Sequence, residues 1–446
     1  MNRQTQHITI IGAGLVGSML SIYLGQRGYT VDVYEKLPDI RQEKISAGRS
    51  INLALANRGI RPLQQLGIFA KVEKLLTPMK GRMLHDHNGN LQFQNYGQKP
   101  QEVIYSVSRG GLVALLRDEA EATKRVKFHF KQSLEAVDFG NKKIRINDQN
   151  HAFDVLIGAD GAGSKVRNAM SQAGVAGVSF AKLDHSYKEL TIAAGANKQF
   201  LMDENALHIW PRGQYMLIAL PNLDASFTVT LFLPSTGETS FASLQTAKDV
   251  DELFARQFKD AKELMPNLTK MFFANPTGTL GTIRCQHWQH KDALLIGDAA
   301  HAVVPFHGQG MNCGFEDCFE LNALLQQHAD DWSIVTPLYC ENRKANANAI
   351  ADMALENYIE MRDSVRDTKF QLKKHIAFAL EKHFPDVFIP RYSMVMFHHI
   401  PYAQAQKRGT IQAAVLEELS SLFTSKEQFD AKIAEQILIK HNLIKT

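Results

Sequence analysis

The chain has 446 residues, of which 45% are apolar and 22% are charged. These proportions are typical of a globular protein with two or three domains, and they exclude a largely disordered chain. The formal charge of +4 is small for this length, so it indicates neither a nucleic-acid partner nor attachment to a membrane surface.

The cysteines and the N-terminal residues indicate a reducing compartment. Cys285, Cys313, Cys318 and Cys340 form no CxxC pair and lack histidines at the spacing of a zinc site, so we expect reduced thiols and no metal. No segment has the roughly 18 uninterrupted apolar residues of a membrane-spanning helix, and we expect no leader peptide before the first strand. We expect a soluble, cytoplasmic protein that is a monomer or a homodimer.

The first predicted elements form a βαβ unit. A buried strand over His7–Ile11 is followed by the glycine-rich segment Gly12–Gly17, a helical run to Gly28, and a second strand over Thr30–Tyr34 that ends at Glu35. The order of strand, glycines, helix, strand and acid is typical of a dinucleotide-binding fold.

Each glycine of this segment has a mechanical reason. Gly12 allows a tight turn, Gly14 lets the backbone approach a pyrophosphate, and Gly17 lets the helix pack close to the strand. Glu35 lies 18 residues after Gly17, where its carboxylate can accept hydrogen bonds from an adenosine ribose. The sequence therefore predicts a bound dinucleotide.

Two later segments repeat a short apolar strand that ends in glycine and aspartate. In parallel sheets, strands of this kind end at the edge where ligands bind, so all three glycine segments could face one cofactor. The two segments are Val155–Ile157 before Gly158 and Asp160, and Ala293–Ile296 before Gly297 and Asp298.

Between these two segments the pattern changes to short antiparallel strands. The expected strands cover residues 205–210, 215–220 and 227–233 and are joined by turns, which indicates a sheet inserted into the nucleotide-binding fold. Beyond about Pro337 the pattern is helical, and the segment from Gly409 to the end is also expected to be amphipathic helix.

The three glycine motifs, in this order, resemble those of the flavoprotein aromatic hydroxylases. More particular stretches are similar to the members of that family that hydroxylate L-kynurenine, a step of tryptophan degradation and of NAD biosynthesis. The resemblance covers the whole chain and implies an FAD-dependent monooxygenase of the soluble bacterial type. The stretches are GRSINLAL (48–55), YSVSR (105–109), NALHIWP (205–211), VPFHGQGMN (304–312), MALENY (353–358) and IPRYSM (389–394).

The resemblance also implies the fold class and the domains. We expect an α/β protein with a Rossmann-like FAD-binding domain, an inserted antiparallel β-sheet domain that binds the substrate, and C-terminal helices. The expected boundaries are 1–78, 103–180 and 283–365 for the FAD-binding domain, 79–102 and 181–282 for the sheet domain, and 366–446 for the helices.

The cofactor-binding residues that the resemblance implies come from all three motifs and the segments between them. Arg109 would help to position the flavin, Asp298 would meet the ribityl or pyrophosphate region, and residues 308–312 would lie along the flavin ring. Gly308 and Gly310 lack side chains that would obstruct a flat ligand, and Pro305 stiffens the approach. The full set is Gly12, Gly14, Val16, Gly17, Glu35, Lys36, Arg49, Ala54, Arg109, Leu134, Asp160, Asp298, Gly310, Met311 and Asn312.

The resemblance implies that Arg82, Tyr96, Asn357 and Tyr392 hold the carboxylate of an aromatic amino acid. Their chemistry agrees, because a guanidinium pairs with a carboxylate and phenol and amide donors fill the remaining lone pairs. An apolar slot for the ring is expected from alternating strand residues, although a plain sheet core would show the same alternation. The slot residues are Ile104, Leu207, Ile209, Met216, Ile218, Leu220, Phe232, Pro305 and Phe306, with His307 beside them.

The chemistry is expected to be carried by the flavin. By the resemblance, NADPH would dock transiently and reduce FAD, and the reduced flavin would take up dioxygen as a hydroperoxide that transfers oxygen to the ring. No residue is assigned a certain catalytic role, and His307 is a possible one. Two other functions are compatible with the flavin motifs: a hydroxylase of a phenolic acid such as hydroxybenzoate or salicylate, and a flavin-binding regulator without turnover.

Overall fold

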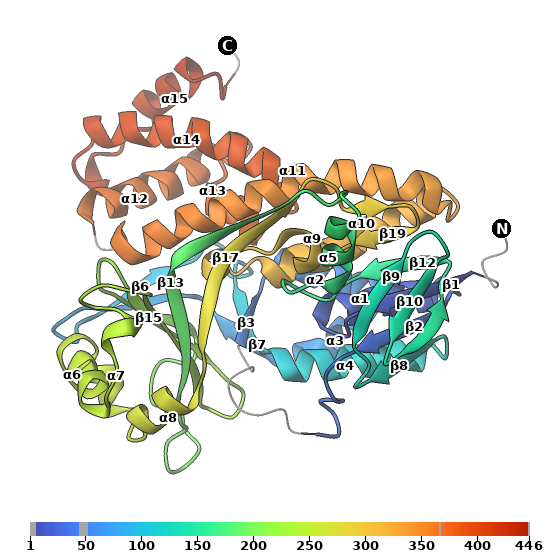
Figure 1. Cartoon of the computed structure of the whole chain (residues 1–446). Coiled ribbons are helices and arrows are strands. Elements are labelled where there is room, and N and C mark those ends of the chain that lie inside the picture. The colour runs from blue at the N-terminus through green and yellow to red at the C-terminus, as the bar shows by residue number, and fades with distance from the viewer. Residues whose placement is uncertain (1–5, 44–51, 365–366, 445–446) are drawn as a thin grey trace.

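The computed structural model describes residues 6–43, 52–364 and 367–444. Figure 1 shows three parts: a lobe around a parallel sheet, a second lobe around an antiparallel sheet, and a layer of helices, coloured orange to red, along one side of both. Two long strands, β13 (Val178–Ile192) and β17 (Thr277–Cys285), form a ribbon that connects the lobes. The predicted α/β fold class is confirmed.

The first lobe contains a six-stranded sheet with the order β18-β19-β12-β1-β2-β8. All its neighbouring pairs are parallel except β18 with β19, so the three predicted glycine-bearing strands do end at one edge. The strands are β1 (His7–Ile11), β2 (Thr30–Glu35), β8 (Val126–Phe130), β12 (Val155–Gly158), β18 (Gln289–His290) and β19 (Ala293–Leu295).

Helices pack on this sheet and form the largest apolar core. Helix α1 (Leu15–Gln26) is apolar on almost its whole surface and lies between α4 (Arg109–Ala122) and α10 (Gly310–Gln327). Its approach to the sheet depends on Gly17, where a Cβ would lie 1.9 Å from the Gly12 carbonyl oxygen. Smaller elements complete the lobe: β3 (Asn52–Leu55), α2 (Asn57–Gln65), α3 (Phe69–Glu73), β4 (Leu76–Met79), β7 (Ile104–Ser108), β9 (Leu134–Asp138), β10 (Lys143–Ile146), β11 (Gln149–Ala152), α5 (Lys165–Gln172) and α9 (Asp298–His301).

The second lobe contains a seven-stranded sheet with the order β17-β13-β16-β15-β14-β5-β6. Its members from the earlier part of the chain are β5 (Gly81–His85) and β6 (Leu91–Asn95), so residues 79–102 and 181–282 share one sheet. The expected boundaries at 180 and 282 fall inside β13 and β17, because these two strands continue from one lobe into the other. The other members are β14 (Ala206–Pro211), β15 (Met216–Pro221) and β16 (Phe227–Pro234).

The two faces of this sheet have different neighbours. Alternate residues such as Leu217 and Val229 pack against the helices of one face in a separate apolar core. The residues between them, such as Met216 and Phe232, face the other way and pack against residues of the first lobe. The helices on the outer face are α6 (Ala247–Gln257), α7 (Lys259–Glu263) and α8 (Leu268–Ala274).

The C-terminal layer is helical, as predicted, but its elements differ in extent. Helix α11 (Trp332–Ile359) begins before Pro337, with Asp331 as its N-cap, and ends in a π-helical turn, η4 (Glu360–Ser364). Gly409 lies inside a helix, where a Cβ would be 2.2 Å from the Cδ atom of Arg391. In the described part of the chain, no helix is long and apolar enough to cross a membrane. The remaining helices are α12 (Thr368–His383), α13 (Arg391–Met396), α14 (Tyr402–Leu422) and α15 (Ala431–Lys440).

Candidate active site

The glycine segment after β1 forms a turn that packs against the backbone just after β12, the strand beside β1 in the sheet. Gly12 has a φ of +103°, and a Cβ there would lie 2.5 Å from the Ala159 carbonyl oxygen. At Gly14, in contrast, a Cβ would have no atom within 4 Å beyond its chain neighbours. The backbone at Gly14 is therefore bare and open at the N-terminus of α1, which is the geometry that a pyrophosphate requires.

Glu35 is held at the end of β2 by the same turn. Its Oε2 atom accepts a hydrogen bond from the Ala13 amide at 2.9 Å, and its Oε1 atom accepts one from the Leu37 amide at 2.9 Å. The residue is buried. Each carboxylate oxygen has a further lone pair, so Glu35 could accept hydrogen bonds from ribose hydroxyls without losing either contact.

Asp160 follows β12, and its two carboxylate oxygens have different surroundings. Its Oδ2 atom accepts hydrogen bonds from the Lys165 and Val166 amides at 2.7 and 3.3 Å, so it caps α5. Its Oδ1 atom is buried without a partner among the described residues, and burial raises the pKa of its carboxyl. Leu134, another predicted cofactor residue, is tied to this helix, because its carbonyl oxygen accepts from Lys165 Nζ at 2.7 Å.

Asp298 and Arg109 are brought together from distant segments. Asp298 follows Gly297, which has a φ of +60°, and its side chain is exposed. Desolvation raises the pKa of the Asp298 carboxyl, and the positive charge of Arg109 acts in the opposite direction. Arg109 is the first residue of α4 and is also exposed. Both residues are therefore accessible to a ligand.

The segment Pro305–Asn312, which we call the GQG loop, consists of a 3₁₀ turn over Pro305–His307, two linking residues and the first three residues of α10. Gly308 has a φ of +65°, a backbone conformation that favours glycine. The side chain of Asn312 is fully used within the protein: its Oδ1 atom accepts from the Ala56 amide at 2.9 Å, and its Nδ2 atom donates to the Ala54 and Gly308 carbonyls at 2.8 Å each. Only the backbone of Asn312 is left for a ligand.

The remaining predicted cofactor residues have more varied positions. Val16 packs against Gly297, and Ala54 lies 3.1 Å from the place of a Cβ on Gly308. Lys36 is exposed and Met311 is buried. Arg49 lies outside the described residues.

The predicted carboxylate-binding residues line one cavity of about 310 Å³. It lies between the second lobe and the C-terminal helices, and His307 of the GQG loop also lines it. We call Arg82, Tyr96, Asn357 and Tyr392 the polar quartet. They come from β5, from the segment after β6, from α11 and from α13, so only the folded chain brings them together.

Aromatic contacts fix the polar quartet. The Tyr96 and Tyr392 rings are stacked with centroids 5.8 Å apart, and the Arg82 guanidinium lies 5.7 and 5.1 Å from those centroids. Asn357 Nδ2 donates to the Phe306 carbonyl at 2.6 Å. Arg82 Nε is buried without a hydrogen-bond partner among the described residues, so the cation keeps a free donor.

The cavity also contains charged residues that were not predicted from the sequence. Glu360 lies 3.4 Å from Arg82 Nη1 and also lines the cavity. Lys374 is nearby, and burial together with the charge of Arg82 lowers the pKa of its ammonium to about 8. No motif marks these residues in the sequence, because they sit in a π-helical turn and in α12 among ordinary surface charges.

His307 is a neutral imidazole in this setting. Burial lowers its pKa to about 4, and its Nδ1 atom has no hydrogen-bond partner among the described residues. Its ring stacks on Tyr392 with centroids 5.4 Å apart.

The predicted apolar slot residues of β14, β15 and β16 lie on the inner face of the seven-stranded sheet, whereas Ile104 belongs to β7 and Pro305 and Phe306 to a 3₁₀ turn. All of them except Pro305 are in two adjoining apolar clusters with Val304 and residues of α11, and none of them is among the residues that line the cavity. Phe306 stacks on Tyr358 with centroids 4.0 Å apart, and Pro305 is exposed. The alternating residues of the strands therefore share one face of the sheet, and their role as a slot for the substrate ring stays a prediction. The residues in these clusters are Ile104, Leu207, Ile209, Met216, Ile218, Leu220, Phe232 and Phe306.

Comparisons with known proteins identify the family. A family model described as an FAD binding domain matches residues 5–354. A kynurenine 3-monooxygenase of Myxococcus xanthus is 46% identical over 438 residues, covering 97% of this chain and 94% of the relative. Another, from Dictyostelium discoideum, is 43% identical over 452 residues, covering 97% and 98%. The chain belongs to the kynurenine 3-monooxygenases.

Solved structures support the fold of this kynurenine 3-monooxygenase family member. A 2-methyl-3-hydroxypyridine-5-carboxylic acid oxygenase has a TM-score of 0.68 at 18% identity, covering 83% of this chain and 96% of its own. The Pseudomonas aeruginosa protein PqsL, solved with 2-aminobenzoylacetate, has a TM-score of 0.66 at 20% identity, covering 80% and 97%. At these identities the likeness concerns the fold alone.

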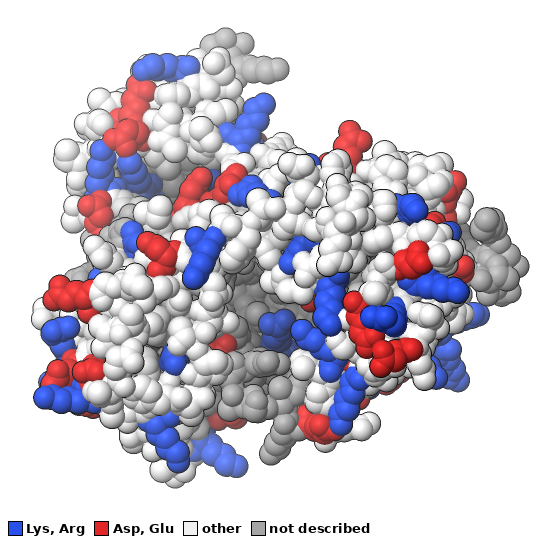
Figure 2. Space-filling model, in the orientation of Figure 1, with Lys and Arg blue, Asp and Glu red and all other residues white. Residues whose placement is uncertain are grey.

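The residues of this kynurenine 3-monooxygenase family member fit FAD. The open backbone at Gly14, the spare lone pairs of Glu35 and the unpaired Oδ1 atom of Asp160 all lie at the ends of the parallel strands. Figure 2 shows a hollow between the two lobes with Lys and Arg side chains along its border, which suits an anionic dinucleotide. FAD is therefore the cofactor of this chain.

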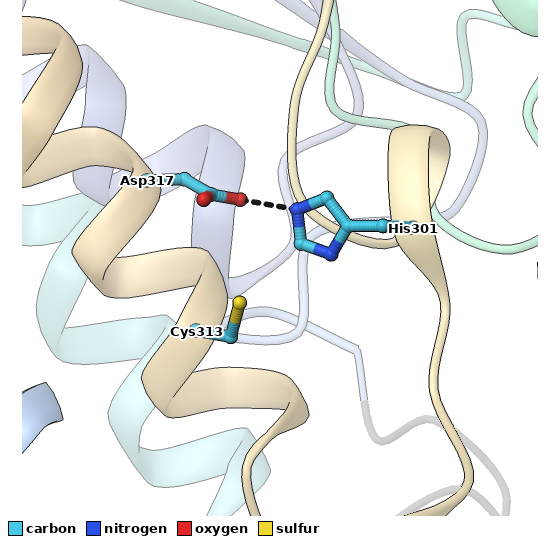
Figure 3. A group of neighbouring side chains, drawn as sticks. All are labelled: His301, Cys313 and Asp317. Carbon is cyan, nitrogen blue, oxygen red and sulfur yellow. Dashed lines mark hydrogen bonds and ion pairs between the residues drawn. The ribbon is translucent and has the colours of Figure 1, made fainter. Parts of the chain in front are cut away.

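A buried group of His301, Cys313 and Asp317 has the residue types of a metal site (Figure 3). The Asp317 carboxylate is already engaged, because it accepts from His301 Nε2 at 2.6 Å and from Arg343 Nε at 2.8 Å. The Gly297 amide also donates to it at 3.2 Å. Since the Arg343 cation lies beside this carboxylate, we interpret the group as an ion-pair network that supports the Gly297 turn.

Proposed function

We propose that this chain hydroxylates L-kynurenine to 3-hydroxy-L-kynurenine, with FAD as bound cofactor and NADPH as transient reductant. The observation that carries the proposal is the single cavity that joins the polar quartet to His307 of the GQG loop. A substrate held by the quartet would have its aromatic end directed at the loop that we assign to the flavin. FAD, once reduced, supplies the oxygen-transfer chemistry from dioxygen.

Recognition of the substrate follows from the charges of the cavity. Arg82 would bind the carboxylate, and Tyr96 and Tyr392 would donate to it, because burial raises the pKa of both phenols and keeps them protonated. Glu360, beside Arg82, would bind the α-ammonium group. The cavity therefore offers one partner for each charge of an amino acid, which a simple phenolic acid would leave half used.

The aromatic ring would lie against the inner face of the seven-stranded sheet. Ile218 and Leu220 are in the apolar cluster that contains Tyr96 and Tyr392, and Phe232 and Phe306 are in the adjoining one. Such a surface excludes water from the reacting ring. The amino group on the ring of the substrate already activates it, so the protein needs to supply position and dryness.

For the cofactor, we propose that the glycine motifs and Arg109 bind different parts of FAD. Gly14 and the first turn of α1 would receive the pyrophosphate, Glu35 the adenosine ribose, and Asp298 with Arg109 the ribityl end. The GQG loop would lie along the flavin ring, with its backbone amides at the start of α10 free to donate.

The test is a direct assay of the purified protein. We expect a yellow protein whose NADPH oxidation is stimulated by L-kynurenine, with a product one oxygen atom heavier. Hydroxybenzoate, salicylate and L-tryptophan serve as matched controls, and none of them should give a hydroxylated product. A yellow protein that hydroxylates a phenolic acid and leaves L-kynurenine unchanged would overturn the proposal, and so would one that forms no product at all.

We further propose a cytoplasmic location. All four cysteines are free, and burial raises the pKa of Cys285 to about 11 and of Cys340 to about 12. Thiols of this kind are typical of a reducing compartment. Fractionation of the native host would check the location, with the protein expected in the cytosolic fraction.

A further inference from the structure

The side chain of Gln309 links the middle of the GQG loop to the C-terminal helices, in addition to the hydrogen bond from Asn357 to the Phe306 carbonyl at the start of the loop. Gln309 is completely buried, and both ends of its amide are used. Tyr402 Oη donates to Gln309 Oε1 at 2.7 Å, and Gln309 Nε2 donates to Met396 Sδ at 3.0 Å. Tyr402 begins α14 and Met396 ends α13, so both partners belong to the C-terminal layer.

Tyr402 is itself fixed from the first lobe. The Arg58 guanidinium of α2 lies 4.0 Å from the centroid of the Tyr402 ring, and its Nη2 atom donates to the Ile400 carbonyl at 2.6 Å. Arg58 also forms a buried ion pair with Glu316 of α10. The Tyr402 hydroxyl therefore has a defined position. A side chain can position another one only if its own position is fixed by its neighbours.

The same buried network extends from Arg58 to the turn at Gly297, which precedes the GQG loop in the chain. Glu316 pairs with Arg343 at 2.7 Å, and Arg343 pairs with Asp317 at 2.8 Å. Asp317 accepts the hydrogen bond from the Gly297 amide. The turn before Asp298 and the middle of the GQG loop are thus held by one set of hydrogen bonds and ion pairs.

We propose that Tyr402 is a positioning residue that acts through Gln309 to hold the GQG loop against the flavin. The proposal rests on the proposed function. Gly308 and Gly310 carry no side chain, so Gln309 and Asn312 supply the side-chain hydrogen bonds of residues 308–312. The first residues of the loop are held separately, by the hydrogen bond from Asn357 to the Phe306 carbonyl. A loop that is less well held would admit water to the site, and NADPH and dioxygen would then be consumed to give hydrogen peroxide and NADP⁺ in place of hydroxylated product.

The decisive variant is Tyr402→Phe, which removes one hydroxyl and keeps the ring. We expect the ratio of hydrogen peroxide to product to rise about three- to tenfold, as for the loss of one buried hydrogen bond. The dissociation constant for FAD, measured by the quenching of flavin fluorescence, should rise in the same direction. The dissociation constant for L-kynurenine should change less than about twofold, because the polar quartet is untouched.

The matched control is Tyr339→Phe. Tyr339 is also completely buried, and its hydroxyl has no hydrogen-bond partner among the described residues. We expect this variant to leave both the peroxide ratio and the affinity for FAD unchanged. A lower melting temperature of Tyr402→Phe with an unchanged peroxide ratio and FAD affinity would show a merely structural role and overturn the proposal.

A double-mutant cycle with Gln309→Met tests the route of the effect. If Tyr402 acts through Gln309, Tyr402→Phe adds no further peroxide and no further loss of FAD affinity on the Gln309→Met background. Equal effects on both backgrounds would overturn the proposal. If the wild-type protein fails to hydroxylate L-kynurenine, the proposed function is wrong. The double-mutant cycle can then still be measured through the dissociation constant for FAD, and it still tests whether Tyr402 acts through Gln309.

Discussion

The proposed cofactor side and the proposed substrate side of this site are built in different ways. On the cofactor side the backbone sets the geometry: Gly12, Gly297 and Gly308 have positive φ angles, and Gly14 leaves open space. On the substrate side the geometry comes from side chains, with a quartet drawn from four separate elements around a cavity of about 310 Å³.

This difference predicts opposite sensitivities to substitution. A backbone site is damaged by adding an atom, since a new Cβ fills the space that a ligand needs. A side-chain site is damaged by removing one, since the charge or donor that recognises the ligand is lost and its buried partner is left unpaired. The variants below test each side in its own way.

The largest effect is expected from Gly14→Ala on the cofactor side. The new methyl group meets no protein atom within 4 Å outside the neighbouring residues, so the melting temperature of the FAD-free protein should stay the same. The affinity for FAD should fall at least about a hundredfold, because the methyl group occupies the place of the pyrophosphate. Calorimetry of the apoprotein and flavin titration measure the two quantities.

Gly12→Ala provides the contrast. Its Cβ would meet the Ala159 carbonyl oxygen at 2.5 Å in a backbone conformation that L-residues rarely adopt, so the protein itself should lose more than about 1 kcal/mol of stability. If Gly14→Ala bound FAD as tightly as the wild type, the assignment of this turn to the pyrophosphate would be wrong.

On the substrate side, Arg82→Met should raise the dissociation constant for L-kynurenine about a hundredfold, the worth of a buried charged hydrogen bond of about 3 kcal/mol. Flavin content should not change. Arg391→Met is the matched control: Arg391 also lines the cavity, but it is half-buried and pairs with Glu356, so we expect less than about a threefold effect. A colourless Arg82→Met protein with normal substrate affinity would contradict the division of roles.

The backbone geometry of the proposed cofactor side could be predicted from local signals in the sequence, and the roles of its single residues stay predictions. Glycine patterns, strand ends and an acid at the right distance are local signals, and the parallel pairing of β12 with β1 and β19 confirms that the three glycine-bearing strands end at one edge. The side chain of Asn312 is an exception, because its hydrogen bonds to Ala54 and Ala56 depend on a segment more than 250 residues earlier in the chain.

The substrate side could be predicted only in part. The resemblance supplied the polar quartet, and the alternation of the strands indicated the inner face of the sheet. Glu360 and Lys374 were missed, because single charged residues in helices look like solvent-exposed ones until the helices are docked. The extent of α11 was also misjudged, since Pro337 lies inside a helix that already begins at Trp332.

A smaller effect is expected from pH. With its pKa lowered to about 8, Lys374 is charged below that pH and adds to the attraction for a carboxylate; it loses this charge above it. The affinity for L-kynurenine should therefore fall about threefold between pH 7 and 9, beyond any change due to the substrate itself. Lys374→Met should remove this part of the dependence and bind more weakly at pH 7.

The neighbouring Lys373 is the control for this measurement. It lines the same cavity but pairs with Glu417 on α14, so Lys373→Met should keep the pH dependence of the wild type. An identical pH profile for the wild type and Lys374→Met would remove Lys374 from the recognition of the substrate.

The smallest effect is expected at His307, where the two sides meet. Because burial lowers its pKa to about 4, the imidazole is neutral from pH 6 to 8 and cannot exchange a proton with the substrate by titrating in that range. His307→Gln should therefore change kcat less than about threefold and leave the pH profile of kcat unaltered, whereas loss of a general acid or base costs about a hundredfold or more. A loss of that size, reversed by added imidazole, would make the chemistry depend on a protein side chain after all. The contrast between a cofactor side made of backbone and a substrate side made of side chains would then fail at the one loop that belongs to both.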